Sequence, residues 1–309
     1  MSNYLLRRLQ HLFWVLLTVS ILVFLLIYLS GDPVRLLAPL DAKPEDVERI
    51  RVLYGLDKPL IVQYWNFVIN ALQGDMGDSF RYDQPALDMV MDKLPATIRL
   101  ALFSLTLTIV IGIPLGLWAG SRPNGVVDWV VSILTFIGIS IPSFWLGIML
   151  ILLFADKLRW LPSSGDATWR HMLMPGITLS IYSIGLVSRL VRSTLIDVMQ
   201  RDYIRTARAK GLREQIVLYR HALRNTMIPT VTVLGLQLGA LLGGSVVVES
   251  VFAWPGVGWL MLQGIQNRDL PLVRAVVLVI GLGFVLINLV VDILYSRLDP
   301  RIRYDEAQS

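Results

Sequence analysis

The chain contains no cysteine, and it carries few charges for its length of 309 residues. The absence of cysteine excludes disulfides, thiol catalysis and metal sites built on thiolates. Only 17% of the residues are charged, against roughly 25% in an ordinary soluble domain. Because 55% of the residues are hydrophobic, we predict an integral membrane protein.

Sequence motifs of catalysis and nucleotide binding are missing as well. There is no G-x-x-x-x-G-K-[ST] phosphate loop and no H-E-x-x-H zinc motif, and the three histidines fall on both sides of the predicted membrane. We therefore predict no catalytic residue, no metal site and no cofactor bound by this chain. Ionisable side chains inside spans usually mark ion-coupled transport. Arg99, Asp128, Glu249 and Asp292 all lie near span ends, so we interpret them as interface anchors and end caps.

Six apolar segments approach the length of about 20 residues that a helix needs to cross a bilayer. They run over residues 12–29, 96–118, 126–155, 172–188, 228–248 and 273–294. The first is longer than the apolar core of a cleaved signal peptide and has no A-x-A cleavage site, so we read it as a retained span. Pro175 and Gly176 dilute the fourth, but without it the basic 189–224 block would share a side with loop 31–94. The predicted fold class is an all-α membrane protein, with residues 1–309 forming one domain of six spans.

Lysine and arginine in short loops orient the spans. One side holds fifteen basic residues, in the N-terminus, the 119–126 loop, the 189–225 segment and the C-terminal tail. The other side holds twelve, but seven of them lie in the long 31–94 segment, which also carries eleven acids. Both termini are therefore predicted to be cytoplasmic.

The 31–94 segment is predicted to fold into a small helical cap outside the membrane. A first helix should start at Pro44, which acidic residues follow, and stop at Gly55. Asp57 and Pro59 should open a second helix that ends before Gly74.

Two glycine ladders stand out among the spans. Their members are Gly112, Gly116 and Gly120 in the second span and Gly235, Gly239 and Gly243 in the fifth. A spacing of four places each ladder on one helix face, where another helix can approach closely. Tight helix packing is the simpler interpretation, and a lining of a transport pathway is compatible with it.

The cytoplasmic stretch "DYIRTARAKGLR", residues 202–213, lies in a segment with nine basic residues between positions 189 and 224. A basic stripe at i, i+4 and i+7 consists of Arg201, Arg205 and Arg208. Ala207 and Gly211 stay small on another face, and Gly211 should end the helix before a second one forms over "REQIVLYRHALRN".

Three interpretations of this helix–turn–helix compete. An ordinary positive-inside loop explains the charge but not the small residues and the glycine turn. A nucleic-acid reader fixed to the membrane at both ends is disfavoured, so we predict no nucleic-acid partner. A docking element for another protein remains.

The docking element resembles the cytoplasmic loop motif of ABC importer permeases, which reads E-A-A, three residues, then Gly. Residues Arg205, Thr206 and Ala207 stand on E-A-A when Gly211 takes the motif glycine. The first two positions depart from the pattern, as does Arg224 where the pattern has proline. The stretch is instead similar to the version in the peptide, nickel and glutathione branch.

Other stretches resemble the first permease subunit of dipeptide or oligopeptide importers, in the same order along nearly the whole chain. They are "GDP" at 31–33, "YGLDKPL" at 54–60, "GDMGDS" at 74–79, "IPSFWLG" at 141–147, "LPSSG" at 161–165 and "VVVESVFAWPGVG" at 246–258.

This resemblance implies a type I ABC importer permease in a bacterial inner membrane, with the 31–94 cap inserted between spans 1 and 2. Its partners would be a second homologous permease, two cytoplasmic ATPases that use ATP and Mg, and a periplasmic or lipid-anchored binding protein. The 189–225 loop would couple to an ATPase through Arg201, Arg205, Thr206, Ala207, Arg208, Gly211 and Leu212. Candidates for an extracytoplasmic gate are Glu249, Phe252, Trp254, Pro255 and Gly256.

Three functions remain in competition at this point. The first is a permease half of an ATP-driven importer of di- or oligopeptides, with glutathione or a nickel chelate as the alternative substrate. The second is a self-sufficient secondary transporter, which predicts a chain of carboxylates or histidines deep in the bundle that the sequence does not show. The third is a membrane receptor or scaffold, which would not need glycine-laddered spans.

Overall fold

The structure is a computed structural model that describes residues 2–29, 43–53 and 56–298. The "GDP" stretch, the start of "YGLDKPL", the expected helix stop at Gly55 and the basic end of the tail lie outside these residues. Within them the chain is helical, apart from turns and an isolated β-bridge between Asp78 and Pro85. The chain divides into two compact units, residues 1–97 with 255–285 and residues 98–254 with 286–309.

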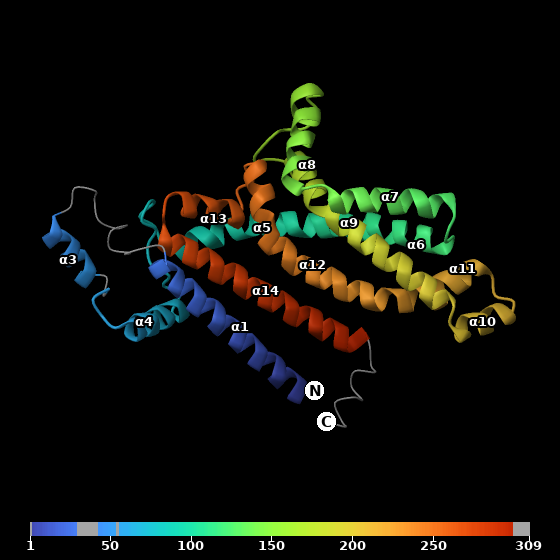
Figure 1. Cartoon of the computed structure of the whole chain (residues 1–309), viewed down its shortest axis with the longest axis horizontal. Coiled ribbons are helices and arrows are strands. Elements are labelled where there is room, and N and C mark those ends of the chain that lie inside the picture. The colour runs from blue at the N-terminus through green and yellow to red at the C-terminus, as the bar shows by residue number, and fades with distance from the viewer. Residues whose placement is uncertain (1, 30–42, 54–55, 299–309) are drawn as a thin grey trace. The chain divides into compact units, whose positions relative to one another are not determined.

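The described residues of the first unit form six helices or parts of helices. They are α1 (Ser2–Leu29), α3 (Pro44–Leu53), α4 (Leu60–Leu72), the start of α5 (Ala86–Leu107), α13 (Val257–Gln266) and most of α14 (Leu270–Leu298). Its core gathers small and branched side chains of α5, α13 and α14, among them Val90, Leu260 and Leu272. Helices α1 and α14 lie side by side (Figure 1), and a Cβ on Gly281 would contact Val19 at 3.4 Å.

The two helices predicted for the cap are confirmed as α3 and α4. Helix α4 ends at Leu72, and Gly74 follows with a φ of +86°, a conformation that favours glycine. The cap boundary is less sharp than predicted, because α5 already begins at Ala86 and continues into the second span. Residues 86–94 are therefore the first turns of that helix rather than a loop.

The second unit is built around α9 (Trp169–Met199). The elements of this unit are the rest of α5, η1 (Thr108–Gly112), α6 (Ile113–Ser121), α7 (Val126–Ser140), α8 (Ser143–Leu150), η2 (Ile151–Lys157), α9, α10 (Asp202–Ala209), α11 (Glu214–Ile216), η3 (Val217–Ala222), α12 (Leu223–Val251) and the end of α14. The η segments are π-helical. Helix α9 packs against α6, α7 and α12, and α10 and α11 follow at its C-terminal end (Figure 1).

The helices of the described residues account for five of the six expected spans, the second to the sixth, in the expected order. Three of these helices are long and apolar enough to cross a membrane, over Ala86–Ser121, Trp169–Met199 and Leu270–Val291. Two bent pairs add one span each when counted together, Val126–Ser140 with Ser143–Lys157 and Glu214–Leu241 with Ser245–Val251. The expected first span falls on α1, whose described apolar part, Phe13–Leu25, is shorter than a spanning helix.

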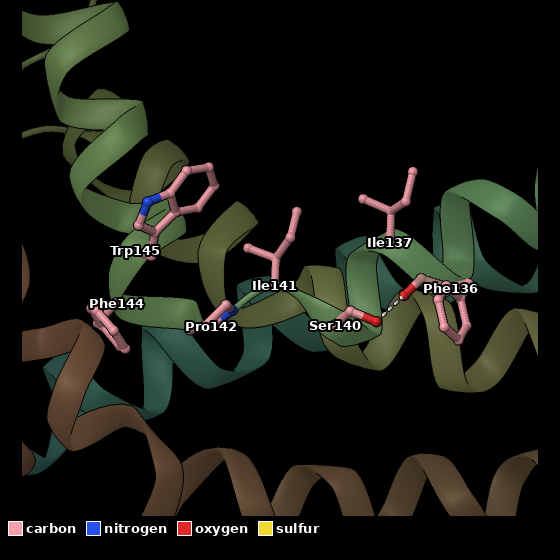
Figure 2. A pocket seen from close by; sticks show the side chains of 7 residues that line it. All are labelled: Phe136, Ile137, Ser140, Ile141, Pro142, Phe144 and Trp145. Atoms are coloured by element: carbon pink, nitrogen blue, oxygen red, sulfur yellow. Dashed lines mark hydrogen bonds between the residues drawn. The ribbon is translucent and has the colours of Figure 1, made fainter.

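The third span, predicted over 126–155, consists of two helices with a sharp bend between them. Helices α7 and α8 meet at an angle of 100° across Ile141 and Pro142. Proline lacks an N–H and pushes the preceding residue out of the helical region, so Ile141 is extended with φ −77° and ψ 123°. Figure 2 shows this corner, where aromatic side chains of both helices line a hollow of about 440 Å³. The Ser140 hydroxyl donates a hydrogen bond to the Phe136 carbonyl at 2.9 Å.

The loop after the fourth span is shorter than predicted. Helix α9 continues through Arg189 and Arg192 to Met199, because no proline interrupts residues 177–199. On the far side, α11, η3 and α12 follow one another without a turn from Glu214 to Val251. The predicted second helix of the docking element therefore leads directly into the fifth span.

Candidate functional site

The candidate site is the helix–turn–helix of residues 201–213, which we call the coupling element. Helix α10 starts after Arg201, whose backbone is extended, and ends at Ala209, with Lys210 as its C-cap. Gly211 follows with a φ of +75°, and its amide donates to the Arg208 carbonyl at 2.9 Å. The predicted glycine break is confirmed, and it is a left-handed helix end that a side chain would strain.

The underside of the coupling element is anchored to the end of α9. Ile204 is fully buried and Ala207 is 5% exposed. These two side chains share one apolar cluster with Leu195, Val198, Val217 and Ala222. In addition, the Asn225 amide donates to the Tyr203 hydroxyl at 2.7 Å, which ties α10 to α12. The element is thus fixed to the helices on both sides of it.

This burial corrects the role predicted for Ala207. The resemblance implies that Ala207 takes part in the contact with an ATPase, but its side chain packs into the chain's own core. A larger residue there would displace α10 from α9 before any partner is met. The alanine of the motif therefore supports the coupling element from beneath.

The outer side of the coupling element is polar and mainly basic. Its exposed residues include Arg201, Arg205, Thr206, Arg208 and Gly211, and Leu212 is half-buried. Arg205 lies 3.7 Å from the carboxylate of Asp202. Arg208 donates to both carboxylate oxygens of Glu214, at 2.7 and 3.3 Å, and so braces the two helices across the Gly211 turn. The arrangement is a positively charged surface that lies on a buried apolar base.

The first glycine ladder packs against α9, one turn at a time. A Cβ on Gly112, Gly116 or Gly120 would meet the carbonyl oxygens of Ile184, Ser188 and Arg192 at 3.4, 2.6 and 3.0 Å. The Ser188 hydroxyl also donates to the Gly112 carbonyl at 2.9 Å. Close packing is therefore confirmed for this ladder.

The second ladder is not uniform. A Cβ on Gly235 would overlap Val291, and Gly239 is buried. A Cβ on Gly243, in contrast, would meet no described atom within 4 Å. Beside Gly235 lies a hollow of about 460 Å³ between α5, α12 and the end of α14, lined by aliphatic side chains such as Leu105, Leu238 and Val290. Such a lining does not suit a charged peptide, and a pathway role for either ladder stays a prediction.

Sequence reasoning missed an ion pair that fastens α7 to α9. The guanidinium of Arg192 donates to both carboxylate oxygens of Asp128, through Nε to Oδ1 and through Nη2 to Oδ2 at 2.7 Å. The Asn124 amide donates to the same carboxylate at 2.9 Å, so the end-cap interpretation of Asp128 holds in part. The two residues are 64 positions apart in the chain, and no local pattern pairs them.

A second missed residue is Asp269, which is fully buried before the start of α14. The Leu272 amide donates to its carboxylate at 3.3 Å, as at a helix N-cap. The same carboxylate accepts hydrogen bonds from the Ser79 hydroxyl and from the amides of Phe80 and Arg81. The "RDLP" sequence predicts that Asp269 is a helix N-cap, but nothing in it predicts the hydrogen bonds to the 79–81 turn.

The gate candidates lie in sequence on either side of residue 254, where the chain passes from the second unit to the first. Glu249, Phe252 and Trp254 end α12 and its following turn, and each is at most 2% exposed. The Phe252 carbonyl accepts from the Gly165 amide at 3.1 Å, and the Trp254 amide donates to the Glu249 carbonyl at 2.8 Å. The interface-anchor interpretation of Glu249 is wrong, because its side chain is buried. Pro255 and Gly256 begin the second segment of the first unit, with Gly256 as the N-cap of α13.

Apolar helices of membrane-spanning length, with a basic helix–turn–helix between two of them, define a multi-pass α-helical membrane protein. Its fold is that of ABC importer permeases. The chain is similar to two crystal forms of the inward-facing MetNI methionine ABC transporter, at TM-scores of 0.59 and 0.58 and 20% identity. The match covers 70% of this chain and 98% of the MetNI chain in the first form, and 68% and 96% in the second.

The chain belongs to the family of binding-protein-dependent transport system inner membrane components. The family model matches residues 112–304, and the model of the family's N-terminal part matches residues 1–101. Among its relatives are the glutathione transport system permease proteins GsiC of Pectobacterium atrosepticum and of Escherichia coli strain K12. Each is 43% identical over 98% of this chain and 100% of the relative. The resemblance seen in the sequence motifs is thereby confirmed, and the chain is a multi-pass inner membrane permease of an ABC importer.

Proposed function

We propose that this chain forms half of the translocation pathway of an ATP-driven importer for glutathione or a similarly small peptide. The observation that carries the proposal is the exposed basic coupling element, which one buried cluster fixes to the end of α9. A surface fixed in this way to a span-forming helix passes a displacement to the helix instead of absorbing it. That is the property required of a contact with an ATPase subunit.

The complete importer would contain a second, homologous permease, two ATPases that bind ATP and Mg, and a periplasmic or lipid-anchored binding protein. This chain would be non-catalytic and would bind no cofactor. Arg201, Arg205, Thr206 and Gly211 would face the ATPase, with Arg208 and Leu212 shaping the turn and Ala207 supporting it from beneath. The 31–94 cap would cover the outer mouth, and the gate candidates around Glu249 would close the pathway on that side.

The substrate proposal follows the relatives at 43% identity, which are named for glutathione transport. The resemblance of the chain's motifs to dipeptide and oligopeptide permeases makes other short peptides and nickel chelates the natural competitors. A tripeptide and a dipeptide share a free carboxylate and an amine, so the binding protein has to provide much of the discrimination.

Reconstitution tests the function directly. The permease pair, the ATPases and the binding protein are placed in vesicles, and uptake of radiolabelled glutathione is measured with and without ATP, in competition with a dipeptide and a nickel chelate. We expect uptake only with ATP and all partners, and stronger competition from unlabelled glutathione than from the other two compounds. Uptake by this chain alone without ATP would instead establish a secondary transporter, and binding without uptake would indicate a receptor.

The proposed orientation, with both termini and the coupling element in the cytoplasm, has its own test. The chain lacks cysteine, so single cysteines report without background. Cysteines at Asp83 and Ser163 should react with an impermeant maleimide in intact cells, whereas one at Gln200 should react only after lysis. Labelling of Gln200→Cys in sealed cells would reverse the orientation.

A further inference from the structure

Helix α4 has three different faces and contains no charged residue. One face is packed, and Phe67 is its buried centre. A second face carries Gln63, Asn66 and Asn70. The third face is apolar yet exposed, with fractions of 79% for Ile61, 62% for Trp65, 47% for Ile69 and 82% for Leu72. At about 100° per residue these four side chains fall within one flank of the helix.

The packed face joins α4 to the C-terminal half of α1, which is the expected first span. Tyr64 and Ser20 share a hydrogen bond of 2.8 Å between their hydroxyls. The ring of Phe24 lies 5.4 Å from that of Tyr64 and 6.1 Å from that of Phe67. Ser20 and Phe24 precede the end of α1 at Leu29 by nine and five residues, or roughly 13 and 8 Å at a rise of 1.5 Å per residue. Helix α4 is therefore placed beside the end of a span and below its tip.

A contact with α14 indicates the same depth of α4 in the membrane. The guanidinium of Arg274 lies over the Phe67 ring at 5.3 Å, and Arg274 is in the first turns of α14. A charged side chain in that place normally reaches the headgroup level of a bilayer while its stem stays among apolar groups. Interfacial helices bury their apolar side by roughly 5–10 Å into the same boundary.

We infer that α4 lies in the plane of the membrane as an interfacial helix, with Ile61, Trp65, Ile69 and Leu72 inserted into the leaflet at the C-terminal end of α1. A cap that stood free in water would expose this flank beside a span, whereas acyl chains already surround the exposed side chains of α1 next to it. Trp65 then occupies the level at which tryptophan is enriched in membrane proteins. The amide face with Asn66 and Asn70 turns toward headgroups and water.

Spin-label accessibility tests the insertion in the assembled importer, reconstituted in vesicles of phosphatidylethanolamine and phosphatidylglycerol. Single cysteines replace Ile61, Ile69, Asn66 and Asn70, and collision rates with dissolved oxygen and with a water-soluble nickel complex are compared. Leu22→Cys on the exposed side of α1 is the lipid reference, and Asp83→Cys in an exposed turn is the water reference. Labels at 61 and 69 should match the lipid reference, and labels at 66 and 70 should match the water reference.

Two results would overturn the inference. Nickel access at 61 and 69 equal to that at 83 would place the flank in water, and shielding from both reagents would mean that a binding protein or the second permease covers it. A second measurement avoids the cysteine variants altogether. The fluorescence lost in Trp65→Phe isolates the signal of Trp65, which brominated lipids should quench if it is inserted and leave unchanged if it is not. None of these readouts depends on the transported substrate.

Discussion

Breaking the Asp128–Arg192 pair from either side should have unequal consequences for stability. The two side chains differ in access to water, because that of Asp128 is 4% exposed and that of Arg192 is 31% exposed. Arg192→Gln therefore leaves a carboxylate buried without its counter-charge, held only by the Asn124 amide and the Ser132 hydroxyl. Asp128→Asn leaves a guanidinium that can turn toward water.

The magnitudes follow from that difference. Removing one partner of a buried ion pair costs about 3–5 kcal/mol, and Arg192→Gln should reach the lower part of this range because two hydrogen bonds to the carboxylate remain. Asp128→Asn should cost about 1–2 kcal/mol, near the value for a lost hydrogen bond to a charged group. The double variant removes the uncompensated charge, so it should be more stable than Arg192→Gln alone by about 1 kcal/mol or more.

The assay is unfolding of the purified permease in mixed micelles as the fraction of dodecyl sulfate is raised, followed by circular dichroism. The four proteins of the cycle give the interaction free energy between the two residues. Equal losses for the two single variants would refute the argument from exposure. Strict additivity in the double variant would refute the ion pair itself.

Three further predictions concern Gly211, Gly235 and the hydrogen bonds of Asp269 to the 79–81 turn. Gly211→Val should cost about 1–2 kcal/mol of strain at a positive φ, whereas Gly211→Asn should cost less. The number of ATP molecules hydrolysed per substrate imported should rise in the valine variant. The same number in the variant and the parent would show that the turn has no part in coupling. Gly235→Val should lower the folded yield in detergent because it overlaps Val291, whereas Gly243→Val should not; equal yields would contradict the packing. Asp269→Asn should weaken the hydrogen bonds that attach the 79–81 turn to residue 269, so that a cysteine at Phe80 reacts faster with maleimide than in the parent. An unchanged rate would show that the turn keeps its position without these hydrogen bonds.

The sequence predicted those features that depend on local chemistry. Helix starts at Pro44 and after Pro59 and the break at Gly211 follow from rules that act within a few residues. The apolar runs predicted the spans for the same reason, since a bilayer sets their length directly. The corner at Pro142 could have been predicted as well, because proline within an apolar run is a known cause of sharp bends.

The remaining features depend on which helices meet. The side of α10 that carries Ala207 is buried only because α9 runs three turns further than its apolar stretch and passes beneath it. The partners Asp128 and Arg192 lie in different helices. Asp269 and Ser79 likewise lie in separate segments of the chain. The sequence identifies such residues as charged or polar, but only the packing decides that they are buried and paired.

The glycine seam along α9 divides that helix into arms of unequal length. The closest approach, at Ser188 opposite Gly116, lies eleven residues from Met199 and nineteen from Trp169. These arms measure roughly 16 and 28 Å at a rise of 1.5 Å per residue. If a stiff helix tilts about the seam, its Trp169 end travels almost twice as far as the end that carries the coupling element. A shift of about 2 Å delivered by a partner to the Met199 end would then become one of about 3.5 Å at the Trp169 end. The force available at the Trp169 end would be smaller in the same proportion.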